Sequence, residues 1–197
     1  GAPAIIGMQE VENIGVLEDL AALPQLADFG YVPYLIDGPD SRGIDVAYLV
    51  RGDQATVEQV EAFPEPTGLT SRPPLLIKAA VAVDGTEQTI YLLNNHLSSL
   101  SSGEAATEPR RTGQAAWNVT IMDQIRADDP DAQFVVLGDL NSFLATPPLQ
   151  ALRDGGLQHV YDFVPEDAAR PYTYIFQGNT QTLDHILVSP ELFAQLT

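Results

Sequence analysis

The sequence lacks cysteine altogether, and Lys78 is its single lysine. Without cysteine the chain has no disulfide, no thiolate metal site and no cysteine nucleophile. This composition suits an extracellular or periplasmic protein, although it does not require that location.

Basic charge is scarce throughout the chain. Nine basic residues stand against 27 acidic ones, and the formal net charge at neutral pH is −18. Such a chain repels polyanions, whereas nucleic-acid-binding proteins neutralise phosphates with Lys and Arg. We therefore expect no tight, metal-independent DNA binding. Hydrolysis of a phosphodiester remains compatible with this charge, because divalent cations can bridge an acidic protein and a phosphate.

Long apolar runs are also missing. No segment approaches the roughly 20 consecutive apolar residues of a membrane-spanning helix. The chain opens with Gly1 rather than with a Met, a basic region and an apolar stretch, so no signal peptide is in view. Its 197 residues, 45% of them hydrophobic, are enough for one domain with a large buried core.

What the sequence does contain is a set of polar residues at the ends of apolar, strand-like segments. There are four such endings: Gln9-Glu10, Asn94-Asn95-His96, Asp139-Leu140-Asn141 and Asp184-His185. Side chains two residues apart in extended chain point the same way, so Asp139 and Asn141 face a common space. A carboxylate beside a carboxamide suits a hard cation or a water next to a phosphate.

A single ending of this kind has a simpler explanation, because Asp and Asn favour turns and a lone His often packs in a core. Four such endings in one chain are harder to explain by folding alone. A buried carboxylate needs a partner or a metal, and a metal shared by several strand ends supplies one. The pattern therefore favours metal-assisted phosphoester hydrolysis.

Apolar periodicity and turn residues predict more strands than helices. We expect four helices: one over residues 12–27, one from the end of a polar loop at 98–108 to about residue 127, one over 146–152 and one that starts at residue 190. We expect strands over residues 31–36, 44–51, 75–83, 88–94 and 134–137, and around residues 172 and 183. Pro24 lies inside the first of these helices and is expected to end it early or to begin a second turn. Two pairs of strands look like hairpins. This arrangement favours a layered α+β fold with antiparallel sheets over a parallel doubly wound sheet.

At these polar endings the chain resembles the endonuclease/exonuclease/phosphatase superfamily, whose fold is that of deoxyribonuclease I and the abasic-site endonucleases. The matching segments occur in family order and are residues 8–13, 41–48, 94–99, 138–141 and 183–189. Residues 172–176, followed by Leu183-Asp184-His185-Ile186, look most like the bacterial extracellular nuclease branch. The resemblance implies a single domain over residues 1–197, folded as a four-layer α/β/β/α sandwich with two mostly antiparallel sheets.

The chain departs from the family pattern at both ends. The family opens with a strand carrying a metal-holding Asn and closes with a strand carrying the histidine beside the attacked phosphate, and residues 1–197 match neither strand. We therefore expect a domain truncated at both ends, with little activity by itself. We also expect an edge or gap in one sheet, which rearrangement or self-association would cover.

The pair Asp184-His185 matches the penultimate motif of the family rather than the closing one. Asp184 is then expected to orient the histidine of the missing strand, and to have a raised pKa as a buried carboxylate without its partner. His185 is expected to be a packed, hydrogen-bonded strand residue. The alternative makes His185 the catalytic histidine itself.

The resemblance implies a role for each remaining ending, and the chemistry of the residues agrees. Glu10 would coordinate Mg²⁺ or Mn²⁺, cations that prefer oxygen ligands, and its affinity is expected to be weak. Asp139 would orient or deprotonate the attacking water, and Asn141 would fix that water or the phosphate. His96 would donate a hydrogen bond to the phosphoryl oxygens.

Two arginines, Arg42 and Arg111, are candidate phosphate contacts, although most exposed arginines are only solvated. Glu12 and Asn13 are candidates for a second polar shell, and a helix cap explains them equally well.

These assignments predict a secreted, metal-dependent nuclease that acts on DNA or RNA. Two alternatives stay open: a phosphatase or phospholipid-head-group phosphodiesterase of the same fold, and a catalytically inert domain.

Overall fold

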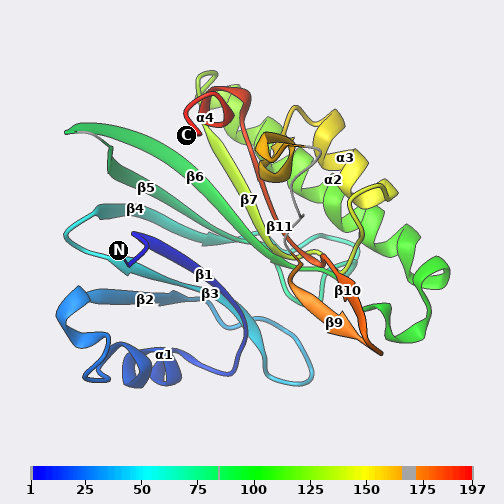
Figure 1. The fold of residues 1–197 in the computed structure, drawn as a ribbon, viewed down its shortest axis with the longest axis horizontal. Coiled ribbons are helices and arrows are strands. Elements are labelled where there is room, and N and C mark those ends of the chain that lie inside the picture. The colour runs from blue at the N-terminus through cyan, green and yellow to red at the C-terminus, as the bar shows by residue number, and fades with distance from the viewer. Residues whose placement is uncertain (1, 84, 166–171, 197) are drawn as a thin grey trace.

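Two β-sheets lie face to face between outer helices, so that the chain forms four layers (Figure 1). The structure is a computed structural model that describes residues 2–83, 85–165 and 172–196. The expected four-layer α+β sandwich is confirmed. None of the helices in these ranges combines the length and the apolar character of a membrane span.

The smaller sheet has three antiparallel strands in the order β1–β3–β2. They are β1 (Ile5–Val11), β2 (Tyr31–Leu35) and β3 (Asp45–Arg51). Helix α1 (Ile14–Ala21) covers the outer face of this sheet, and the Asn13 side chain caps it by accepting a hydrogen bond from the Val16 amide. The helix-cap explanation of Asn13 is therefore confirmed.

The larger sheet has six strands in the order β4–β5–β6–β7–β11–β8. Its strands are β4 (Ala55–Ala62), β5 (Leu75–Val83), β6 (Thr86–His96), β7 (Phe134–Asp139), β8 (Gln158–His159) and β11 (Asp184–Val188). Only the pair β6–β7 is parallel, and the long helix α2 (Glu104–Asp128) makes that crossover. Helix α3 (Pro147–Asp154) lies beside α2 on the outer face.

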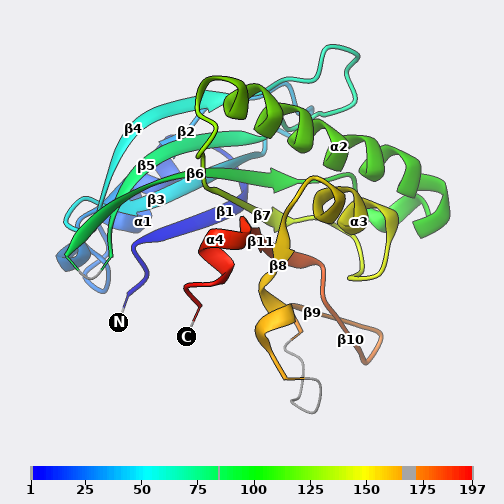
Figure 2. The same ribbon diagram turned by 90° about the horizontal axis from the view of Figure 1, so that it is seen from above.

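Several short elements complete the described chain. They are three 3₁₀ helices, η1 (Ala27–Phe29), η2 (Leu100–Ser102) and η3 (Val160–Phe163), the strands β9 (Tyr174–Phe176) and β10 (Asn179–Gln181), and helix α4 (Pro190–Phe193). Figure 2 shows that the β9–β10 hairpin projects away from the two sheets.

Side-chain alternation along β3 explains why two sheets and a helix layer pack here. Val46, Tyr48 and Val50 point toward the larger sheet and join the core between the two sheets. Ala47 and Leu49 point the other way and pack under α1. Residues 46–50 of β3 are all apolar and are thereby buried on both faces of the strand.

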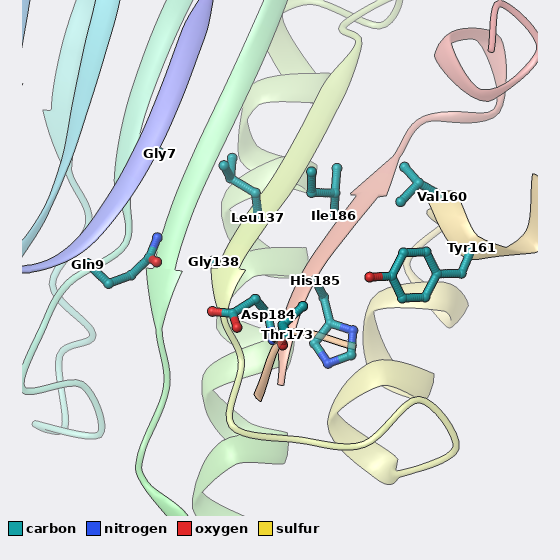
Figure 3. Close-up of a pocket in the computed structure, with 10 residues that line it drawn as sticks. All are labelled: Gly7, Gln9, Leu137, Gly138, Val160, Tyr161, Thr173, Asp184, His185 and Ile186. Atoms are coloured by element: carbon teal, nitrogen blue, oxygen red, sulfur yellow. Dashed lines mark hydrogen bonds between the residues drawn. The ribbon is translucent and has the colours of Figure 1, made fainter. Parts of the chain in front are cut away.

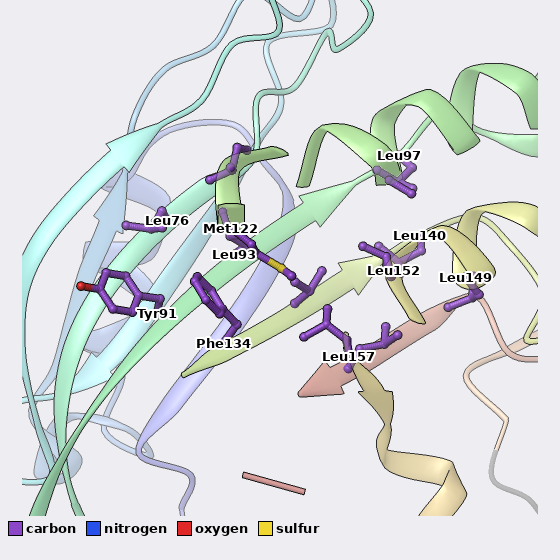
Figure 4. Close-up of a cluster of buried hydrophobic side chains, with 14 of the residues drawn as sticks. Leu76, Tyr91, Leu93, Leu97, Met122, Phe134, Leu140, Leu149, Leu152 and Leu157 are labelled. Carbon is purple, nitrogen blue, oxygen red and sulfur yellow. The ribbon is translucent and has the colours of Figure 1, made fainter. Parts of the chain in front are cut away.

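The largest apolar cluster fills the space between the larger sheet and the helices α2 and α3 (Figure 4). Phe134 and Val136 supply the β7 side of this cluster, and Met122 and Leu152 supply the helix side. All four are fully buried, so β7 is held firmly along its length up to the Gly-Asp ending.

Three expectations about the elements were wrong in detail. Strand β4 was not predicted, because its alternation of short apolar and polar residues gives a weak signal. The first helix ends at Ala21 instead of reaching residue 27, as the expectation that Pro24 ends it early allowed. The second helix begins at Glu104, inside the expected polar loop. Pro109 therefore lies within this helix, although proline is most common at the first position of a helix.

The two sheets differ in width, and this leaves part of the larger one uncovered. Strand β1 is an edge of the smaller sheet. Beside it a cavity of about 240 Å³ is lined by Gly7, Leu137 and Ile186, among others, and Ile186 is 43% exposed. The inner face of β7 and β11 is therefore accessible next to β1.

We predict that Gly138→Ala is strongly destabilising. Gly138 has φ +128°, and a Cβ there would lie 2.0 Å from the Asn95 carbonyl oxygen across the parallel pair. We expect a loss of about 3 kcal/mol or more in the free energy of unfolding, measured by urea denaturation. The control is Gly30→Ala, where φ is +62° but no atom lies within 4 Å, and where a cost of only about 1–2 kcal/mol is expected. Equal losses in the two variants would contradict the close-approach argument.

Candidate active site

Three neighbouring strands of the larger sheet bring polar residues side by side. His96 at the end of β6 pairs in register with Asp139 at the end of β7, and Asp139 pairs with Asp184 at the start of β11. His96 Nε2 lies 3.5 Å from Asp139 Oδ2. Residues paired in register share one face of a sheet. The structure therefore brings these three predicted residues together, while their catalytic roles stay predictions.

Glu10 approaches the same place from the smaller sheet. The register between β1 and β3 shifts between Met8 and Val11, and Glu10 within this bulge has φ +59°. A bulge of this kind re-aims a side chain, and a glutamate at positive φ is uncommon. The Glu10 carboxylate is exposed and lies 3.8 Å from the Arg42 guanidinium, so Arg42 also borders the site.

A buried amide ties the two sheets together directly behind Glu10. Gln9 Nε2 donates to Asn94 Oδ1 at 2.7 Å. Asn94 Nδ2 in turn donates to the carbonyl oxygens of Met8 (3.0 Å) and Ala47 (2.9 Å). These bonds fix the end of β6 against β1 and β3, so they set the separation between Glu10 and the residues of the larger sheet.

Asn95, the next residue of β6, points to the other face of the sheet and connects the strand to helix α2. Asn95 and Asn118 exchange two side-chain hydrogen bonds of 3.0 and 2.9 Å, and Gln114 Oε1 accepts the Ser98 amide hydrogen at 2.9 Å. Sequence analysis missed Asn118 and Gln114. Their only signal was two amide side chains on the apolar face of a helix. His96 is thus held between two buried anchors.

The titration of Asp139 and His96 follows from their burial. Burial raises the pKa of the Asp139 carboxyl to about 6; the Asn141 amide opposes this, and the charges of Asp184 and Glu10 add to it. Burial lowers the pKa of the His96 imidazole to about 4, and the charges of Arg72 and Arg42 act in the same direction. At neutral pH the site therefore holds an ionised Asp139 beside a neutral His96.

The unused nitrogen of His96 is an exception to the usual pairing of buried polar atoms. Within the described residues, His96 Nδ1 has no hydrogen-bond partner although the side chain is 4% exposed. Buried polar atoms are normally satisfied by protein or water. This atom is available to a water or a substrate oxygen.

Arg72 borders the candidate site, although the sequence did not single it out. It is buried, its Nη1 lies 2.5 Å from Asp40 Oδ2, and its Nε donates to the His96 carbonyl oxygen at 3.3 Å. This ion pair holds the backbone at His96 and places a positive charge behind the site. A lone arginine between Ser and Pro residues gives no sequence signal for such a role.

Asn141 occupies a constrained loop that follows β7. Its φ is +46°, its backbone N–H donates to Asp139 Oδ1 at 2.9 Å, and its side-chain Nδ2 donates to the Leu97 carbonyl oxygen at 3.2 Å. The loop thereby supports the carboxylate of Asp139 from behind. The Asn141 amide oxygen remains for water or phosphate.

The structure corrects the assignment of Arg111 as a phosphate contact. Arg111 is 1% exposed. Its nitrogens donate to the Ser142 hydroxyl (3.1 Å), the Thr107 hydroxyl and the Glu104 carbonyl oxygen (3.2 Å). It braces the loop after β7 against the start of α2 and does not reach solvent. Arg42, by contrast, is exposed beside Glu10.

The expectation that Asp184 is buried was also wrong, because its side chain is exposed. Alternation along β11 sends Asp184 to the cavity beside β1 and His185 to the other side (Figure 3). His185 is buried and bonds the Ser142 carbonyl oxygen and His159, not Asp184. The expectation that His185 is a packed, hydrogen-bonded residue is confirmed.

The donor set at this site fits a hard cation. Within the described residues no three His, Cys, Asp or Glu side chains are close enough to enclose an ion. Burial is the main cause of the raised pKa of Asp139, the charges of Asp184 and Glu10 add to it, and a cation would relieve that added repulsion. Exposed Glu10 would hold such an ion, with water completing its coordination.

Comparison with known proteins agrees with this geometry. A family model described as "Endonuclease/Exonuclease/phosphatase family" matches residues 1–197. No curated protein sequence matches the chain significantly.

Similar solved structures cover 95% of this chain. The human Nocturnin catalytic domain with bound sulfate has a TM-score of 0.71 at 17% identity over 69% of its length. Truncated TDP2 of Caenorhabditis elegans has 0.65 at 21% identity over 71%. A mannosyl-6-phosphatase of Bacteroides thetaiotaomicron has 0.69 at 21% identity over 71%. At these identities the likeness shows the fold.

We predict that Asp139→Asn stabilises the protein at neutral pH. A carboxyl whose pKa is raised in the folded state, here to about 6, adds stability below its unfolded pKa, and that stability is lost as the pH rises through 6. Asparagine removes this dependence. We expect the variant to gain on the order of 2 kcal/mol over the wild type at pH 7, and the gain to vanish near pH 4.

The measurement is urea denaturation at both pH values, with the exposed α1 residue Asp19 changed to Asn as the control. A gain that is the same at pH 4 and pH 7 would contradict the burial of an ionised Asp139.

Proposed function

The chain belongs to the endonuclease/exonuclease/phosphatase family, and from this premise we propose that it hydrolyses phosphodiesters with Mg²⁺ or Mn²⁺. The single observation that carries the proposal is the register pairing of neutral His96 with ionised Asp139 at the mouth of a carboxylate-lined site. A base beside a hydrogen-bond donor is what attack of water on a phosphate requires.

Each residue of the site has a separate role in the proposed reaction. Asp139 accepts a proton from the attacking water while the new P–O bond forms and the bond to the leaving oxygen breaks. His96 donates a hydrogen bond to a phosphoryl oxygen as negative charge accumulates there. Glu10 would hold the cation, which when bound would neutralise phosphate charge and stabilise the leaving oxygen. Arg42, exposed beside Glu10, contacts the substrate phosphate.

Asn141 and Asp184 complete the proposed site. Asn141 supports Asp139 with its backbone amide and presents its side-chain oxygen to the water. Asp184 lies on the open side of Asp139 and orients the groups around the phosphate. We propose these roles because the register pairs Asp184 with Asp139, and because the Asn141 backbone N–H donates to the Asp139 carboxylate.

A nucleic acid is the substrate that we favour, as a secreted bacterial nuclease would use. A solved structure of Danio rerio TDP2 contains a single-strand DNA product and has a TM-score of 0.66 to this chain at 18% identity. The relationship to a mannosyl-6-phosphatase supports the second candidate, a phosphatase for small phosphoesters, and the net charge of −18 suits that candidate better. Secretion and self-association through the β1 edge stay proposals of the same kind.

The substrate experiment compares plasmid DNA, a single-stranded oligonucleotide, bis-p-nitrophenyl phosphate and p-nitrophenyl phosphate in Mg²⁺ or Mn²⁺. Residues 1–197 and the complete gene product are assayed in parallel. Cleavage of the two nucleic acids and of the diester supports the nuclease. Turnover of p-nitrophenyl phosphate alone would favour the phosphatase, and no metal-dependent turnover by the gene product would overturn both.

We predict that His96→Ala and Asp139→Asn each lower kcat on the preferred substrate by about 10²–10³, because both act on charge that develops in the transition state. Circular dichroism should show an intact fold in both. The control is Asp19→Asn, which removes an exposed carboxylate from α1 and should keep full activity. Turnover near the wild-type rate in either site variant would remove the role assigned to that residue.

We predict that the Mg²⁺ affinity is weak, in the high-micromolar range or weaker, since Mg²⁺ keeps most of its waters and Glu10 is its principal anchor. Isothermal titration calorimetry measures it directly. Glu10→Gln should abolish the remaining heat, and Glu12→Gln on the same segment is the matched control. Low-micromolar binding that survives Glu10→Gln would show that other residues hold the ion.

A further inference from the structure

Two buried histidines behind the site form a continuous hydrogen-bonded chain. His159 at the end of β8 is 0% exposed and His185 in β11 is 2% exposed. His159 Nε2 lies 2.9 Å from His185 Nδ1, and His185 Nε2 lies 2.7 Å from the carbonyl oxygen of Ser142. At the other end, the Tyr161 backbone N–H donates to His159 Nδ1 at 3.0 Å.

The backbone groups at the two ends determine where the protons lie. The Tyr161 N–H can only donate, so His159 Nδ1 accepts and the His159 proton is on Nε2. That proton points to His185 Nδ1, which therefore accepts as well. His185 then carries its proton on Nε2 and donates it to the Ser142 carbonyl, which can only accept. Every bond in the chain is made only when both rings are neutral and both protons are on Nε2.

Ser142, whose carbonyl oxygen accepts the last hydrogen bond of this chain, belongs to the loop of the candidate site. Ser142 follows Asn141, whose φ of +46° is maintained only if the surroundings hold the loop. The Ser142 hydroxyl accepts from Arg111 Nε, and the Leu140 N–H donates to the Leu183 carbonyl. The bond from His185 is therefore one of several that fix the loop from different elements.

We propose that His159 and His185 act as a positioning pair, which in its doubly neutral, Nε2-protonated form holds the loop of Asn141 and Ser142 in the conformation that supports Asp139. The proposal rests on the hydrolysis proposed above. Neither ring touches the reacting atoms. Their action passes through the Ser142 carbonyl to Asn141, and from the Asn141 amide to the Asp139 carboxylate.

Titratable and charged groups lie on the elements that pack around this pair. They are Asp184 on β11, Asp162 and Tyr161 on η3, Arg153 on α3, Arg111 on α2 and Asp139 on β7. Burial lowers the pKa of the His185 imidazole, while the Ser142 carbonyl, Asp184 and the Thr182 carbonyl oppose that shift. The lowered pKa favours a neutral His185 at pH 7. Protonation of His185 would place an N–H on its Nδ1, facing the Nε2–H of His159. Protonation of His159 would place an N–H on its Nδ1, facing the backbone N–H of Tyr161.

The first test reads the tautomers directly and needs no activity. Long-range nitrogen–proton correlation spectra of isotope-labelled histidine in the folded protein at pH 7 report which ring nitrogen carries hydrogen. We expect Nε2-protonated neutral rings for both residues. On acidification, we expect the Asn141 and Ser142 amide signals to shift with the same midpoint as the His185 ring. An Nδ1-protonated ring, an imidazolium at pH 7, or loop signals that ignore the His185 titration would overturn the proposal.

The second test separates positioning from simple stability. His185→Gln keeps a side-chain N–H able to reach the Ser142 carbonyl, and His185→Leu does not. On bis-p-nitrophenyl phosphate we expect His185→Leu to lower kcat about ten- to a hundredfold with little change in KM, and His185→Gln to stay within about threefold of the wild type.

The control is Tyr91→Phe, which loses a part-buried hydrogen bond from the middle of β6 to Asp129 at the C-cap of α2, and should leave kcat unchanged. Wild-type turnover in His185→Leu, or equal loss in both His185 variants, would overturn the proposal. A wild-type protein without metal-dependent turnover would overturn the proposed function instead, and the tautomer test would still decide the state of the pair.

Discussion

The close approach of β6 and β7 at Asn95 and Gly138 is the constraint on which the site depends. The Asn95 carbonyl oxygen occupies the space that a Cβ at position 138 would need. Only a glycine allows the two strands to run in parallel at this spacing up to their ends, where His96 and Asp139 face each other. Because α2 must cross over between these strands, the helix is also tied to this register through Asn95 and Asn118.

The sequence predicted the parts of this arrangement that depend on local pattern. Strand β7 and its Gly-Asp-Leu-Asn ending, the Asn13 cap and the meeting of the strand ends follow from apolar runs and from the polar residues that end them. The features that it did not predict depend on distant contacts. The bulge that turns Glu10, the ion pair of Arg72 and the burial of Arg111 require partners 30 or more residues away, which no window of sequence contains.

The burial of two arginines also affects how the net charge of the protein acts on an anionic substrate. Arg72 and Arg111 are buried and hold loops around the site, so they do not offset the acidic surface. The net charge of −18 is therefore met by few accessible positive charges near the site. A polyanionic substrate would meet little attraction over most of this protein and would depend on cations at the site itself.

The two amides Asn94 and Asn95 connect adjacent residues of one strand to layers on opposite sides of the sheet. Because the side-chain period of a strand is two, inserting or deleting one residue near this end of β6 would exchange the two connections and turn His96 away. During evolution, this end of the strand must therefore keep its length. The other end, where Val83 pairs with Thr86 far from the site, is free to vary, and it is the natural place to insert a tag or a reporter domain.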